Sequence, residues 1–140
     1  MTLTEIAYGS PEYQLTLALR ERVLRIPLGL KLSDNDTIDE DQQLHFTTLH
    51  EGTLLACVVA KPLGGGTVKL RQMAVCPQHQ GRGLGRQLLK FAEDTLRQRG
   101  FQRIEMSARQ SAIGFYEKIG YRTIGDAYVE RGIPHIKMQK

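Results

Sequence analysis

Tryptophan is absent from the sequence, cysteine occurs only twice, and no apolar run approaches the roughly 20 residues that a membrane-spanning helix needs. The two cysteines, Cys57 and Cys76, form no CxxC pair and have no histidines around them at ligand spacing. We therefore expect two small buried hydrophobic side chains there, and no metal. The first residues lack the basic start and apolar stretch of a secretory signal, so we expect a cytoplasmic protein that does not enter a membrane.

The composition is that of a globular protein, and its charge is divided unevenly along the chain. The 140 residues are 41% hydrophobic and 24% charged, which indicates a single domain over residues 1–140. Residues 1–66 carry 5 basic and 9 acidic side chains, whereas residues 67–140 carry 14 basic and 6 acidic ones. A basic half suggests an anionic ligand and an acidic half a cationic one. Nucleic acid is disfavoured as a partner, because the basic residues lack the interleaved aromatic side chains that single-strand binders use.

The pattern of apolar residues and turn signals predicts an α/β fold with a mixed sheet and helices on both faces. A helix is expected to begin at Ser10, to carry Leu15, Leu19 and Val23 on its apolar stripe, and to end at Pro27. The strands between residues 43 and 75 are expected to form an antiparallel meander. Strands are expected over 2–8, 43–50, 53–60, 67–75, 101–108, 121–128 and 133–139, and helices also over 84–99 and 111–119.

The most informative segment is VCPQHQGRGLGR, residues 75–86, which passes from a strand through a glycine-rich loop into a helix. Such a loop directs several backbone N–H groups at one point, and the helix dipole adds partial positive charge there. Glycine lets a phosphate approach closely and tolerates a positive φ that costs other residues about 1–2 kcal/mol. Arg82 and Arg86 can add charge-assisted hydrogen bonds to a pyrophosphate. The segment therefore predicts a diphosphate site, although it has no Walker motif and carries Arg86 where a Rossmann fingerprint needs its third glycine.

Two motifs in this half of the chain resemble those of the GNAT acetyltransferases. Residues 80–85, QGRGLG, match the signature Q/R-x-x-G-x-G/A, and residues 112–121, AIGFYEKIGY, match the later motif A-x-x-F-Y-x-K-x-G-F/Y. With the preceding strand they cover residues 67–125 in the family's order and spacing, and the ending GIPH is similar to that of small bacterial GNAT proteins. The resemblance implies a mixed, mostly antiparallel sheet that is splayed between its fourth and fifth strands.

The resemblance also implies an N-acetyltransferase that uses acetyl-CoA. The acyl-CoA would lie in the splay with its thioester near Ser107 or Ala108, and a primary amine would attack it directly. The acceptor, a small molecule or a peptide, is left open, and so is a non-catalytic module that only binds or senses acyl-CoA. Exposed edge strands would allow a homodimer. The coenzyme A contacts that the resemblance implies are Met73, Ala74, Val75, Gln80, Gly81, Arg82, Gly83, Leu84, Gly85 and Arg86.

The later motif also supplies a candidate catalytic acid. Its tyrosine, Tyr116, corresponds to the residue that protonates the departing thiolate in many members of the family. A general base would help as well, because a lysine-type amine has a pKa of about 10.4. The family's usual glutamate is missing from the fourth strand, which reads LRQM at residues 70–73. The candidates for the base are Glu105, His135, an acid of the segment 34–41, or a water chain to a remote carboxylate.

The remaining polar residues have simpler interpretations. His79 is expected to be solvated in the glycine-rich loop, and His45 and His50 are expected on the surface of the sheet. The acidic segment is expected to be a mobile solvated loop or, alternatively, a rim of the acceptor site that attracts a cationic amine. Its acids are Asp34, Asp36, Asp39, Glu40 and Asp41.

Overall fold

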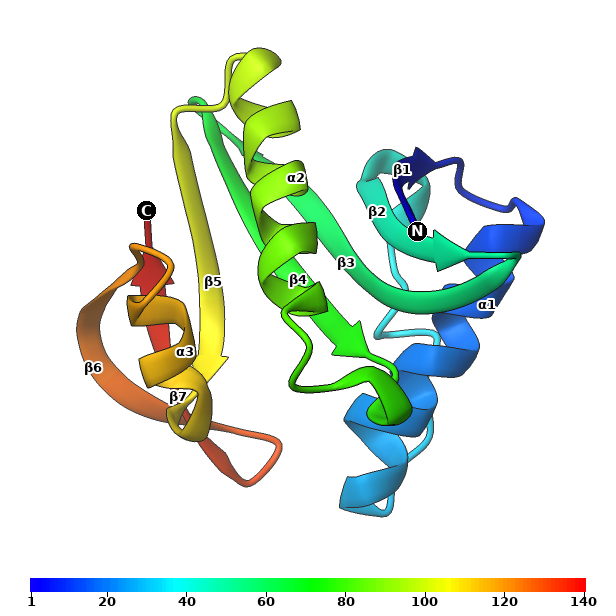
Figure 1. The fold of residues 1–140 in the computed structure, drawn as a ribbon. Coiled ribbons are helices and arrows are strands. Elements are labelled where there is room, and N and C mark those ends of the chain that lie inside the picture. Colours follow the sequence, from blue (N-terminus) through cyan, green and yellow to red (C-terminus); the bar gives the residue numbers. More distant parts are fainter.

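The computed structural model describes all residues, 1–140, and places seven strands in one sheet (Figure 1). The strand order is β1-β2-β3-β4-β5-β7-β6, and every neighbouring pair is antiparallel except β4 and β5, which are parallel. The mixed, mostly antiparallel sheet expected from the sequence is confirmed. The elements are β1 (Thr2–Ile6), α1 (Pro11–Arg20), β2 (Leu44–His50), β3 (Thr53–Gly64), β4 (Thr67–Val75), α2 (Leu84–Gln98), β5 (Arg103–Arg109), α3 (Ile113–Glu117), β6 (Arg122–Glu130) and β7 (Ile133–Gln139).

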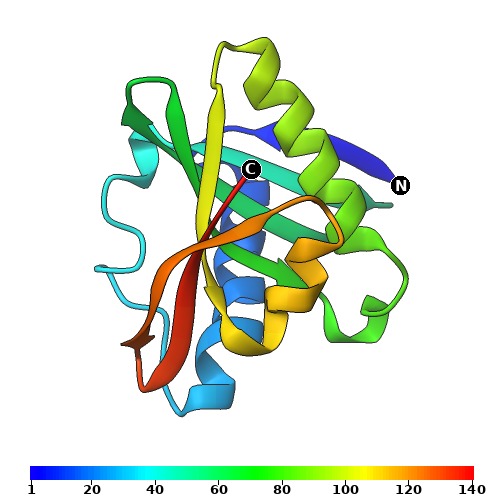
Figure 2. The same cartoon turned by 90° about the vertical axis from the view of Figure 1, so that its left-hand side faces the viewer.

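Helices α1 and α2 cover opposite faces of this sheet (Figure 1 and Figure 2). Val58 of β3 belongs to the apolar cluster that contains Leu88 and Leu89 of α2. The preceding residue, Cys57, belongs to a second cluster with Leu19 of α1. Because successive residues of a strand point to opposite faces, the two helices must pack on different sides. The expected helices on both faces and the expected burial of both cysteines are therefore confirmed.

The first helix begins as predicted but buries a different face. Ser10 caps it, because its hydroxyl accepts a hydrogen bond from the Tyr13 amide at 3.2 Å. Leu15, expected on the apolar stripe, is 43% exposed, whereas Arg20 on the buried face is completely covered. Charged and hydroxyl side chains occupy this face because they find partners there, which periodicity cannot reveal. The helix also continues past the expected end, through a π-helical turn (Glu21–Arg25) and a 3₁₀ turn (Ile26–Leu28) that contains Pro27.

The helix expected over 111–119 is shorter than predicted. A 3₁₀ turn (Gln110–Ala112) leads into α3, and the amides of Ile119 and Gly120 bond to carbonyls three residues back instead of four. The last turn is therefore tightened and leaves the α-helical pattern. No helix of the structure is both long enough and apolar enough to pass through a bilayer.

Strands β4 and β5 separate part of the way along their length. Their pairing begins at Thr67 beside Arg103 and ends at Leu70 beside Met106. Just beyond that point β4 has a bulge, where Gln72 adopts a φ of 54° and two residues face Val58 of β3. A bulge bends its strand and increases the twist. Strand β5 meanwhile stays paired with β7 up to Arg109, so a gap opens between β4 and β5 toward their carboxyl ends.

Candidate active site

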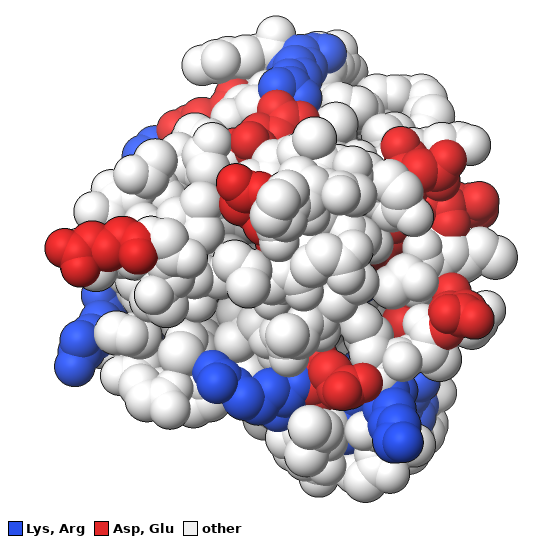
Figure 3. Space-filling view, turned by 90° about the vertical axis from the view of Figure 1, so that its right-hand side faces the viewer, with Lys and Arg blue, Asp and Glu red and all other residues white.

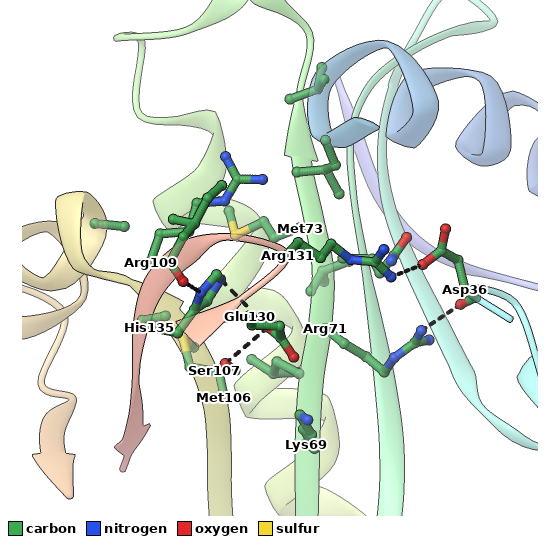
Figure 4. A pocket seen from close by; sticks show the side chains of 18 of the residues that line it. Asp36, Lys69, Arg71, Met73, Met106, Ser107, Arg109, Glu130, Arg131 and His135 are labelled. Carbon is green, nitrogen blue, oxygen red and sulfur yellow. Dashed lines mark hydrogen bonds and ion pairs between the residues drawn. The ribbon is translucent and has the colours of Figure 1, made fainter. Parts of the chain in front are cut away.

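A cavity of about 410 Å³ occupies this gap (Figure 4). Its walls come from β4, from β5, from the extension of α1 and from the β6–β7 hairpin. Ser107 and Ala108, where the sequence places the thioester, both line it, and so do Met73, Tyr116 and His135. The gap therefore gathers Tyr116, His135 and the expected place of the thioester, whereas Met73 is the one predicted coenzyme A contact that lines it.

The glycine-rich loop leads from the end of β4 to the first turn of α2. Gly81 and Gly83 both have a φ of 79°, and Gly83 is the residue before the helix. No side chain caps α2, so its first amides keep their hydrogen-bonding capacity for a ligand. The loop is tied to β4 by Gln80, whose side-chain amide donates to the Val75 carbonyl at 3.2 Å.

Gly85 brings the start of α2 directly against β4. A Cβ atom added at this position would stand 2.8 Å from Cε of Met73 and 3.5 Å from Cγ2 of Val75. A larger residue here would therefore require the flexible end of the Met73 side chain to move. Arg82 and Arg86, within the loop and the first turn of α2, are both exposed. The uncapped amides and two exposed arginines thus belong to the same short segment that follows the open edge of β4.

Tyr116 reaches the cavity from α3. Its hydroxyl lies 3.9 Å from the sulfur of Met73, a weak acceptor, and its ring packs on Tyr121 at a centroid distance of 5.9 Å. Burial raises the pKa of the Tyr116 phenol, and the positive charge of Arg109 only partly opposes this. The phenol therefore keeps its proton at neutral pH and has no strong internal acceptor to which it would donate it.

His135 lies on β7 with Glu130 across the hairpin from it. Its Nδ1 is 2.8 Å from the Ile133 carbonyl, and since a carbonyl can only accept, Nδ1 carries a proton. The other ring nitrogen, Nε2, is therefore the one that can receive a proton, and it lies 3.5 Å from the Glu130 carboxylate. The same carboxylate accepts a hydrogen bond from Ser107 at 3.4 Å, and Ser107 also bonds to the Tyr128 hydroxyl. Nε2 of His135 therefore faces a carboxylate across the hairpin.

Sequence reasoning missed Glu130, although a signal for it exists. The β6–β7 hairpin pairs Glu130 with Ile133, so only Arg131 and Gly132 form the turn. Both have positive φ, 52° and 75°, as a two-residue type I′ turn requires. This turn sets the register of the hairpin, in which Tyr128 lies opposite His135 and Glu130 lies opposite Ile133, two residues from His135. A sequence analysis that recognised the turn could have placed Glu130 near His135.

The structure separates Glu105 from the other predicted catalytic residues. Its carboxylate pairs with Lys137 of β7, with 3.2 Å between the charged atoms. Glu105 lies level with Lys69, on the part of β5 that is still paired with β4, and does not line the cavity. The cavity thus brings Tyr116 and His135 together but not Glu105.

The acidic segment 34–41 is not the solvated loop that was expected, because two of its carboxylates are buried. Glu40 is 1% exposed and forms a two-pronged ion pair with Arg20 of α1. It also accepts hydrogen bonds from the Tyr13 hydroxyl and from Arg71, each at 2.7 Å. Burial opposes the charged form of Glu40, but its bonds to Arg20, Tyr13 and Arg71 outweigh this and lower its pKa.

His45 belongs to the same buried cluster and is not on the sheet surface, where it was expected. It is 2% exposed, and its Nε2 donates to the Glu40 backbone carbonyl at 2.8 Å. Burial lowers the pKa of His45, so the ring is neutral and structural. Its partner lies in a segment without helical or strand periodicity, so sequence could not predict the contact. His50 is exposed, as predicted.

Asp36, the second buried acid of the segment, lies in the cavity wall but cannot act as a base. Arg25 and Arg131 both pair with it, and the Ser33 amide donates to it at 2.9 Å. Burial alone would raise its pKa, but the bonds to Arg25 and Ser33 prevail and lower it to about 2. Of the base candidates named from the sequence, only His135 combines a place in the cavity with a free ring nitrogen.

Comparison with known proteins agrees with this geometry. The profile of the acetyltransferase (GNAT) family matches residues 12–121, and the chain belongs to that family. It is 26% identical over 132 residues to YitI, an uncharacterised N-acetyltransferase of Bacillus subtilis, with 89% of each chain covered.

Solved structures share the fold over nearly the whole chain. A candidate N-acetyltransferase from Lactobacillus plantarum superimposes with a TM-score of 0.88 at 29% identity, covering 100% of this chain and 98% of that one. An aminoglycoside 6′-N-acetyltransferase, whose structure contains coenzyme A, has a TM-score of 0.75 at 18% identity, with coverages of 100% and 96%.

Proposed function

We propose that this protein transfers an acetyl group from acetyl-CoA to a primary amine. The observation that carries the proposal is the cavity between β4 and β5, which lies beside the uncapped start of α2 and contains both Tyr116 and His135. The coenzyme A found in the aminoglycoside acetyltransferase of the same fold supports it.

The residues present fit coenzyme A. The amides at the start of α2, with Arg82 and Arg86, would hold its pyrophosphate. Beyond Leu70 the edge of β4 is not paired with β5, so the backbone of Met73, Ala74 and Val75 is where the pantetheine chain would run. The thioester would then lie beside Ser107 and Ala108.

His135 and Tyr116 would each carry out one of the proton transfers that the reaction needs. A primary amine arrives mostly as the ammonium ion, and Nε2 of His135, backed by Glu130, would take the proton that it must lose before its nitrogen can bond to the acetyl carbon. The carbon–sulfur bond breaks in the same reaction, and Tyr116 would supply the proton that the departing thiolate needs. The nitrogen loses a second proton as the amide forms. Two protons thus leave the nitrogen, one is gained by the sulfur, and the net proton passes to solvent as His135 and Tyr116 return to their starting protonation states.

Calorimetry of coenzyme A binding tests the first requirement, which is that Arg82 and Arg86 bind the diphosphate. Replacing both Arg82 and Arg86 by alanine is expected to weaken coenzyme A binding at least about tenfold, because each removes charge-assisted hydrogen bonds worth more than a neutral one. The control is Arg103→Ala, which removes one positive charge beyond the opposite end of α2. If neither variant changes the affinity, the diphosphate is held elsewhere.

A pH profile tests the base. His135→Gln is expected to lower kcat/KM by about 10²-fold near pH 7, since general base catalysis is worth about that much. The deficit should shrink as the pH approaches the pKa of the amine, because a neutral amine needs no base. His50→Gln, on the exposed end of β2, is the control. A deficit that stays constant with pH would assign His135 to positioning only.

The alternative function is an acyl-CoA-binding module without catalysis. One observation favours it: β4 carries no carboxylate in the gap, and Arg71 there is fully engaged by Glu40, Gln43 and Asp36. Incubation with acetyl-CoA and a broad panel of amines decides between the two. Release of free thiol supports the transferase, and tight coenzyme A binding without any release supports the module.

A further inference from the structure

The charged side chains of the cavity wall are mostly cations. Five arginine or lysine side chains line the cavity, against two carboxylates, Asp36 and Glu130. Asp36 is already engaged by Arg25 and Arg131, while Glu130 faces His135 and Ser107. Asp36 is therefore unavailable to a cationic substrate, and a single carboxylate, Glu130, remains against the cations of the wall.

Lys69 has no partner within the protein. It is partly buried on β4, lines the cavity, and makes no ion pair, whereas the neighbouring lysine, Lys137, takes up Glu105. Arg109, at the end of β5, also lines the cavity without an ion pair, whereas Arg25 is bound to Asp36. Arg71 is held by the buried acids, but Arg131 is 38% exposed and uses only one edge of its guanidinium on Asp36. Glu105, the register neighbour of Lys69 on β5, is already paired with Lys137, so the Lys69 ammonium can accept an anionic partner from a ligand.

The position of Lys69 relative to the expected place of the thioester determines how far apart the amine and the anionic group of such a ligand would lie. Lys69 is level with Glu105, two residues before Ser107 on β5, and two residues of strand span about 6.6 Å. In Figure 4, Lys69 lies below Ser107 and Glu130, and Arg131 passes over the gap toward Asp36. If the amine nitrogen lies at the level of Ser107, an anionic group attached only a few bonds from that nitrogen could therefore reach Lys69.

We propose that the acceptor is an amine that bears an anionic group, a carboxylate or a phosphate, which Lys69 binds together with the free edge of Arg131. This inference rests on the proposed function, because it names the acceptor of that same site. It also revises the expectation of a cationic acceptor. The outer surface on the α1 side does carry many acidic side chains (Figure 3), but the cavity has the opposite charge.

The test compares matched amines that differ only in charge. An α-amino acid, its carboxamide and the corresponding aminophosphonate are offered with acetyl-CoA, beside spermidine as a polycation, and thiol release is followed. In the wild-type protein the anionic members are expected to give the higher kcat/KM. The carboxylate and the phosphonate show which anion the site prefers. Lys69→Gln should raise KM for the preferred anion about tenfold and change the carboxamide less than twofold, as loss of one charge-assisted contact would.

Lys61→Gln serves as the matched control, since this lysine is exposed on β3 and outside the cavity. Faster turnover of spermidine or the carboxamide, or an equal loss for all amines in Lys69→Gln, would overturn the anionic acceptor while leaving the transferase intact. If no amine releases thiol, calorimetry of the same amines on the CoA-saturated protein decides. Lys69-dependent binding of the anionic member would keep the site and refute the transferase, and absence of that binding would refute the site.

Discussion

Replacing Tyr116 by phenylalanine is expected to lower kcat by about 10²-fold and to leave the affinity for coenzyme A unchanged. The phenol is the only protonated oxygen that α3 directs into the cavity, and burial raises its pKa, so it can still donate at neutral pH. The ring itself, which packs on Tyr121 and Phe115, is retained in the variant, so the local fold should survive. Thiol release under saturating substrates measures kcat, and calorimetry measures binding.

Tyr8→Phe is the control for this experiment, because Tyr8 is 52% exposed and lies outside the cavity. The two variants lose the same hydroxyl group and differ only in where it was. A Tyr116→Phe protein that turns over as fast as Tyr8→Phe would remove the phenol from the mechanism. Water would then have to protonate the thiolate.

The second large effect concerns stability. Glu40→Gln is expected to reduce the free energy of unfolding by about 3–5 kcal/mol, because it leaves the completely buried Arg20 without a counter-charge. That is a large part of the 5–15 kcal/mol by which a typical domain is stable. The change also weakens the hold on Arg71, and Arg20 itself donates to Gln72 in the bulge of β4 at 2.8 Å. Urea unfolding followed by far-UV circular dichroism measures the loss.

A neighbouring acid provides the comparison. Asp41→Asn removes one carboxylate from the same 3₁₀ turn, but Asp41 is exposed and makes no ion pair. Its effect should stay within about 0.5 kcal/mol, as for most surface substitutions. Equal stabilities of the two variants would show that the Glu40 network contributes little. If Glu40→Gln does not fold, replacing Arg20 and Glu40 together by methionine and leucine should recover part of the stability, because the completely buried Arg20 charge is then removed and only Arg71 loses its ion pair.

The local features of the site could be predicted from the sequence. The turn QGRGLG and the stripe of Leu84, Leu88, Ala92 and Leu96 are determined by neighbours within a few residues, and the structure buries all four side chains of the stripe. The same holds for the Ser10 cap and for most strands of the sheet. Positive φ, helix periodicity and strand alternation are properties of short stretches, so a single sequence displays them.

The tertiary structure alone decided which charged side chains are buried and which partners they pair with. Glu40 meets Arg20 and Arg71 across 20 and 31 residues of chain, and Arg131 meets Asp36 across 95. No local pattern distinguishes these acids from Asp34 or Asp41, which are exposed. Whether a carboxylate is solvated, buried or poised beside a histidine depends on which distant elements pack against it. The sequence by itself therefore indicated the fold and the start of α2 at which we propose that the diphosphate binds, whereas the packing decided that most charged side chains of the cavity are cations and that Glu130 lies beside His135.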